Sequence, residues 1–199
     1  MSIKISIPLD LSQISVSQFV AYYGSRNETE KVMAISGKSR KIVESFQYST
    51  IQEIIESFEE AMKRGVAKHE QTFIVDGMRL GFIPDLNAIS LKEHIDLDLF
   101  SNEIWKKDAT DYTMLPKLLA ILYRPVRGKL GSFYELEEYD SDLSKLHIDR
   151  IGMITMDRVN GALVFFSTIA NECALNGAEY LVEEMKKEMM MDPSLSLQD

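Results

Sequence analysis

The sequence predicts an α+β protein that is predominantly helical, with a short N-terminal strand, a central β-hairpin and a long C-terminal helix. Three patterns carry this prediction. Apolar and polar residues alternate over 3–7, two apolar runs flank Asp76 and Gly77, and apolar residues recur every three or four positions from Met156 to Met190. Alternation at period two is typical of a half-buried strand, whereas spacings of three and four are typical of one helix face.

The N-terminal strand is predicted to end at Pro8, and a short capped helix follows it. Ser15 can accept a hydrogen bond from the backbone of Gln18 while the Gln18 side chain reaches back, which is a capping box. Gly24 ends this helix, and residues 27–37 are predicted to form a second short helix that ends at Gly37.

Residues 50–64 show the clearest amphipathic pattern in the chain. Their apolar positions fall on one stripe, and the acidic positions lie away from it. The stripe consists of Ile51, Ile54, Ile55, Phe58 and Met62. We expect Thr50 and Glu53 to form the capping box of this helix and Gly65 to end it.

The hairpin is predicted at residues 72–84, around the dipeptide Asp76-Gly77. These two residue types tolerate the positive φ angles of a type I′ turn, the turn that suits tightly connected antiparallel strands. The second strand then ends at Ile83-Pro84, as the N-terminal strand ends at Ile7-Pro8.

The two strand ends belong to a longer internal similarity with a spacing of 75 residues. The matching pairs are Asp10 and Asp85, Ile14 and Ile89, Ser15 and Ser90, and Gln18 and Glu93. Two interpretations remain open. The similarity reflects either a duplicated strand-turn-helix unit or the coincidence of common strand-stop and helix-start signals.

The segment after the second copy is predicted to contain a helix, a loop and a strand. Pro116 suits the first turn of a helix that continues to Leu122, and Pro125 is expected to stop it. Residues 127–132 are predicted to be a mobile basic loop. The strand at 133–139 carries charges that suit a sheet edge.

The long C-terminal helix carries the candidate interaction residues. Their spacing of three and four is that of a coiled-coil seam, with small residues that let another backbone approach closely. The candidates are Leu163, Phe166, Ala170, Cys173, Gly177 and Tyr180. The seam forms either the core of a monomer or the contact of a homo-oligomer. We expect one domain over residues 1–190 and a flexible tail over 191–199.

Composition limits the partners and the compartment. The formal net charge is −9, which disfavours nucleic acid and an anionic membrane surface as partners. No apolar run approaches the roughly 20 residues that cross a bilayer. With a single cysteine, Cys173, and no signal-peptide pattern, we expect a soluble protein of a reducing cytoplasm.

No residue pattern indicates a reaction, so we expect no catalytic residue, cofactor or metal. The three histidines lie far apart, and "GKSRK" at 37–41 lacks the earlier glycine of a phosphate-binding loop. "KEHIDLD" is the one cluster that could hold a metal, through Glu93, His94, Asp96 and Asp98. Its ordinary interpretation is an acidic, capped helix start.

The pattern of several segments resembles small virion-assembly proteins of tailed bacteriophages. The resemblance covers roughly residues 72–166 and rests on "FIVDGMRLGFIPDLNAISLKEHIDLD", "MLPKLLAILYRPV", "YELEEYD" and "MDRVNGALVFF". It implies a non-enzymatic role in phage morphogenesis, as a tail-assembly chaperone or as a structural subunit of the tail or neck. Its partners would be other phage structural proteins, in the host cytoplasm or in the virion. The alternative from another class is an enzyme or small-molecule binder whose site is assembled from distant residues.

Overall fold

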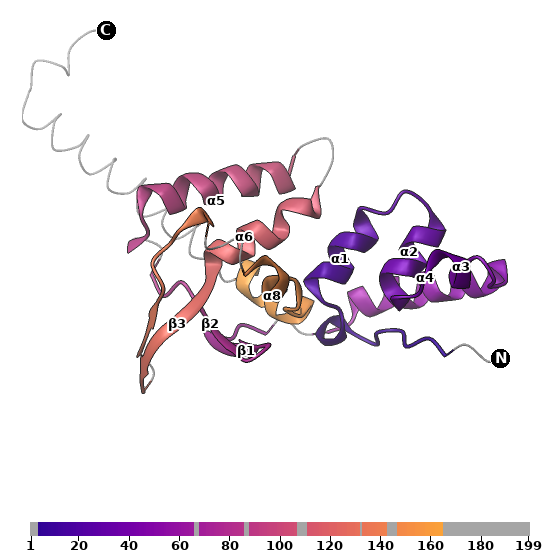
Figure 1. Cartoon of the computed structure of the whole chain (residues 1–199), viewed down its shortest axis with the longest axis horizontal. Helices are drawn as coiled ribbons and strands as arrows, with labels where there is room; N and C mark the ends of the chain where they lie inside the picture. The colour runs from indigo at the N-terminus through magenta and orange to yellow at the C-terminus, as the bar shows by residue number, and fades with distance from the viewer. Residues whose placement is uncertain are drawn as a thin grey trace, which may run out of the picture. The chain divides into compact units, whose positions relative to one another are not determined.

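A computed structural model describes residues 4–65, 68–85, 88–106, 111–131, 133–142 and 147–164. The chain divides into two compact units, Met1–Ala162 and Leu163–Asp199, and of the second only residues 163 and 164 are described. The described part of the first unit has an α+β fold in which helices accompany a four-stranded antiparallel sheet (Figure 1).

Short helices and one longer amphipathic helix form the N-terminal part of the first unit. They are η1 (Leu11–Gln13), α1 (Val16–Tyr23), α2 (Glu28–Ser36), α3 (Arg40–Val43) and α4 (Tyr48–Lys63). The capping box of Ser15 and Gln18 is confirmed at the start of α1. The second short helix is also confirmed, and it ends at Gly37, whose φ of 63° lies in the left-handed region that glycine adopts without strain.

Two expectations for this part need correction. The predicted N-terminal strand is not confirmed, because residues 4–8 have no regular secondary structure even though the exposure of side chains 4–7 alternates. The capping box of Thr50 and Glu53 is wrong. Helix α4 begins at Tyr48 after the cap residue Gln47, which makes no side-chain capping bond, and Thr50 already lies inside its first turn.

The sheet is a meander of β1 (Thr72–Val75), β2 (Met78–Phe82), β3 (Tyr123–Leu130) and β4 (Phe133–Leu136) in that spatial order. The predicted hairpin is confirmed, since β1 pairs with β2 and both Asp76 (φ 46°) and Gly77 (φ 74°) have positive φ. The edge position of the fourth strand is confirmed as well. The basic loop is wrong at residues 127–130, which continue β3. Residues 128–130 pair with β4, and Arg127 lies at an irregularity in the register.

Helix α6 (Leu115–Leu122) provides much of the core between the other elements. Its side chains are buried from Leu118 to Leu122, and it contacts α5 (Leu91–Ile104), α8 (Ile148–Gly152), α1 and η3 (Tyr112–Met114). Pro116 lies in the first turn of α6 as predicted. Pro125 does not interrupt regular structure, because the chain passes directly from α6 into β3.

The two copies of the internal similarity share a turn and a helix cap. Gln13 N donates to Asp10 O (3.2 Å) in the first copy, and Ala88 N donates to Asp85 O (3.3 Å) in the second. Ser90 and Glu93 form a capping box at α5, as Ser15 and Gln18 do at α1. The first copy has the turn η1 but no preceding strand among its described residues, and its Ile14 is fully buried while Ile89 is partly exposed. Among the described residues, a strand therefore precedes the turn and the helix in the second copy alone.

The C-terminal helix begins at residue 156 and is described to residue 164. Its start is fixed by an antiparallel bridge in which Val16 N donates to Ile154 O (2.8 Å) and Met156 N donates to Ile14 O (2.9 Å). The length predicted for this helix, most of the predicted seam and the tail at 191–199 lie outside the described residues.

Candidate functional site on helix α5

A buried ion pair holds α5 against the sheet. Glu93, in the first turn of α5, accepts a hydrogen bond from Ser90 N at Oε2 (2.6 Å), and its Oε1 lies 3.0 Å from Arg124 Nη1 on β3. The exposed fractions of the two side chains are 6% for Glu93 and 14% for Arg124. Burial lowers the pKa of Arg124, and the charge of Glu93 opposes that effect. The helix is thereby fixed both at its cap and to a strand.

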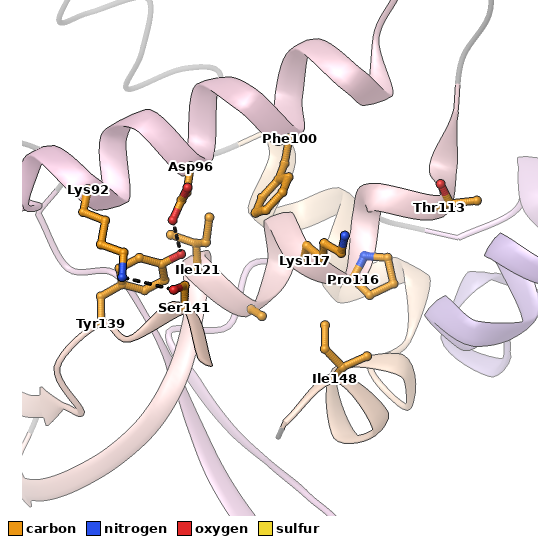
Figure 2. A pocket seen from close by; sticks show the side chains of 11 residues that line it. Lys92, Asp96, Phe100, Thr113, Pro116, Lys117, Ile121, Tyr139, Ser141 and Ile148 are labelled. Carbon is orange, nitrogen blue, oxygen red and sulfur yellow. Dashed lines mark hydrogen bonds between the residues drawn. The ribbon is translucent and has the colours of Figure 1, made fainter. Parts of the chain in front are cut away.

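One side of α5 borders a pocket of about 340 Å³ that is also lined by residues of η3, α6 and α8 and by residues after β4 (Figure 2). Lys92, Asp96 and Phe100, which lie four residues apart along α5, face this pocket. Ile121 of α6 and Ile148 of α8 add apolar surface. Residues far apart in the sequence therefore line the same pocket.

Four polar side chains of the pocket lie together at one end of it, and Lys117 and Thr113 lie toward the other end (Figure 2). The four are Lys92, Asp96, Tyr139 and Ser141. The Tyr139 hydroxyl donates to Asp96 Oδ2 (2.6 Å), and Lys92 Nζ donates to Ser141 Oγ (3.0 Å). Burial and the hydrogen bond to Asp96 raise the pKa of Tyr139, which favours the protonated phenol that donates to Asp96. Farther along, Lys117 Nζ lies 5.6 Å from the centre of the Phe100 ring.

The outer side of α5 carries an exposed apolar row, Leu91, Ile95 and Leu99, called here the α5 row. These side chains are 76%, 56% and 51% exposed, respectively. Residues four apart on a helix lie one above another on the same face, so the row is continuous. Helix α5 thus presents a polar-rimmed pocket and an apolar face side by side.

The residues considered as metal ligands do not converge. Glu93 faces Arg124, and Asp96 accepts from Tyr139. His94 Nδ1 and Asp98 Oδ2 form an exposed pair 3.4 Å apart. Within the described ranges, no group of three or more His, Cys, Asp or Glu side chains is placed to hold a metal ion.

Of the six candidate seam residues, the structure describes only Leu163, which is partly buried. The other five lie outside the described residues, so the seam stays a prediction.

Two features of α5, its exposed apolar row and the pocket beside it, were not predicted from the sequence. The four-residue spacing of Leu91, Ile95 and Leu99 was a usable signal for the row, but nothing local marks Tyr139 or Ser141 as neighbours of α5.

Comparisons with protein-family models, with curated proteins and with solved structures found no match to this chain. In the part of the chain that the structure describes, no helix combines the length and hydropathy needed to cross a bilayer.

Proposed function

We propose that this chain is a non-enzymatic bacteriophage morphogenesis protein that acts by protein-protein interaction, as a tail-assembly chaperone. In this proposal the α5 row binds an amphipathic helix of another phage structural protein. The observation that carries the proposal is the exposure of Leu91, Ile95 and Leu99 on a helix that a buried ion pair fixes in place.

The α5 row suits a helix as its partner. It extends over about 12 Å, roughly two helical turns, since a helix rises 1.5 Å per residue. Burying apolar surface contributes about 25 cal/mol per Å², and apolar anchors at helical spacing are the usual way in which one helix recognises another surface. A rigid apolar row therefore binds such a helix without the cost of ordering α5 first.

The first test is a phage in which this gene is deleted, examined for tails by electron microscopy. We expect tailless or aberrant particles, restored by the wild-type chain supplied from a plasmid. Mass spectrometry of purified wild-type virions then separates the two roles. Absence from the virion supports the chaperone, while a stoichiometric amount supports a structural subunit. Normal tails in the deletion phage would overturn the proposed role altogether.

The second test asks whether the partner binds the α5 row. Ile95→Glu should abolish complementation while leaving the free energy of unfolding within about 0.5 kcal/mol, because Ile95 is already solvent-exposed. Ile74→Glu is the matched control, since Ile74 is 59% exposed but lies on β1. Full complementation by Ile95→Glu would show that the partner does not use this row.

A further inference from the structure

We propose that the pocket between α5, α6 and α8 binds a small organic anion with an apolar body, such as an aryl carboxylate. This inference uses the inner side of α5 and does not depend on the morphogenesis role. Three features carry it: the shape and lining of the pocket, the charge of its rim, and the hydrogen bonds that its polar groups have already made.

The lining suits an apolar body. Phe100, Pro116, Ile121 and Ile148 approach the hollow from α5, α6 and α8 (Figure 2). A volume of about 340 Å³ falls at the lower end of the range for small-molecule sites. Side chains from separate elements of one folded unit border it, so a flat aromatic ring system would contact protein on more than one side.

The charge of the lining favours an anion. Lys92 and Lys117 contribute two ammonium groups and Asp96 contributes one carboxylate, in a chain whose formal net charge is −9. The lining therefore carries one net positive charge, although the whole chain is acidic. An organic cation would meet two like charges and one opposite charge, whereas an anion meets two opposite charges and one like charge.

The existing hydrogen bonds leave the two cations available. Asp96 accepts from the Tyr139 hydroxyl, which engages the single carboxylate of the lining. Lys92 donates to the neutral Ser141 hydroxyl, and Lys117 lies over the Phe100 ring; neither ammonium group forms an ion pair with a carboxylate among the described residues. An ammonium group has three donors, so Lys92 can bind a ligand carboxylate and keep Ser141.

These features place the ligand. Its aromatic body contacts Phe100, Ile121 and Ile148, and its carboxylate lies at the rim near Lys92, with Lys117 as the second cation. A hydrogen bond between a charged donor and a charged acceptor is about twice as strong as a neutral one. The carboxylate should therefore decide which ligands bind tightly, while the apolar lining decides which bodies fit.

The test compares 2-naphthoate with the neutral 2-naphthalenemethanol in NMR titrations of the ¹⁵N-labelled full-length chain. We expect saturable binding of 2-naphthoate at millimolar or lower concentration, with shift changes centred on residues 92–100, 116–121 and 148. The neutral probe should bind about tenfold more weakly, the effect of one charge-assisted hydrogen bond. Equal affinity for the two probes, or no saturable binding of 2-naphthoate, would overturn the proposal.

Two variants distinguish the contribution of the lysine charges to ligand binding from the contribution of the pocket's shape. Lys92→Met with Lys117→Met should remove the preference for the anion and keep weak binding of the neutral probe. Ile148→Trp should fill the hollow and weaken both probes. Lys4→Met with Lys41→Met is the matched control, because it deletes two exposed lysines outside the pocket. An unchanged anion preference in the Lys92/Lys117 variant would contradict the assigned site, provided its spectrum shows the native fold.

Discussion

At the scale of single residues, Glu70 joins the segment before β1 to the start of the C-terminal helix. Arg158 Nε donates to Glu70 Oε2 (2.8 Å), Lys68 also pairs with Glu70, and the Arg158 guanidinium lies 5.0 Å from the Phe73 ring. Burial alone would raise the pKa of Glu70, but the hydrogen bonds and charges of Lys68 and Arg158 outweigh it and lower the pKa below its ordinary value of 4.5.

The sign of this shift makes stability pH-dependent. A carboxyl whose pKa is lower in the folded state contributes stability that is complete above pH 4.5 and is lost as pH falls through the folded pKa. Glu70→Gln should therefore lower the free energy of unfolding by about 1 to 2 kcal/mol at pH 7. The difference between the wild type and this variant should disappear at acid pH. Urea unfolding at a series of pH values measures it.

Glu56→Gln is the control for this experiment, because Glu56 is exposed on α4 and the substitution makes the same chemical change. Its effect should stay within about 0.5 kcal/mol at pH 7. If the difference in unfolding free energy between the wild type and Glu70→Gln stays constant from pH 7 to acid pH, the charge of Glu70 does not stabilise the fold.

At the scale of elements, one capping motif, a Ser or Thr followed three residues later by Gln or Glu, has two outcomes in this chain. Ser15 caps α1, where Gln18 N donates to Ser15 Oγ (3.2 Å) and Ser15 N donates to Gln18 Oε1 (3.1 Å). Thr50 has an acid three residues later but lies inside α4, where its backbone N–H already donates to Gln47 O (3.0 Å). A capping motif shows that a helix start is compatible with the sequence, and packing decides where the start falls.

This difference predicts unequal effects of one substitution. Ser15→Ala should lower the free energy of unfolding by about 1 kcal/mol, because two backbone N–H groups at the helix start depend on the box. Thr50→Ala should change it by less than about 0.5 kcal/mol, since Thr50 caps nothing and alanine is a good helix former. Paired denaturation curves of the two variants give the comparison. Equal losses would mean that α4 begins at Thr50 in solution.

The predictable elements are those that local chemistry determines. Asp76-Gly77 fixes the hairpin through its positive φ angles, and Gly37 ends α2 for the same reason. The N-terminal alternation of residues 3–7 failed as a signal, because a strand also needs a partner strand and the described residues 4–8 have none. The pairing of residues 128–130 with β4 was likewise not predicted, since register depends on residues beyond the local pattern.

At the scale of the whole molecule, the first unit is held together by contacts that no local pattern reveals. Glu93 was interpreted from the sequence as a capping residue, and it does cap α5. Its second role, as the partner of Arg124, requires β3 to pass under the start of the helix. The pocket depends on the same arrangement, because Tyr139 and Ser141 follow β4, and the pairing of β3 with β4 brings that segment to α5. The sequence could therefore predict the elements but not the tertiary contacts between them.

The ion pair of Glu93 and Arg124 provides the sharpest test of that arrangement. Arg124→Met leaves a buried carboxylate without its counter-charge and should lower the free energy of unfolding by about 3 to 5 kcal/mol. Glu93→Gln leaves Arg124 unpaired in turn, although glutamine still completes the capping box, as Gln18 does in α1. The double variant removes both charges, so its loss should be smaller than the sum of the two single losses. Urea unfolding of the four proteins, with an unchanged slope against denaturant, measures the coupling energy. Additive losses would show that the two charges do not interact across the interface between α5 and β3, and that the helix bearing the apolar row and the pocket is held by apolar packing alone.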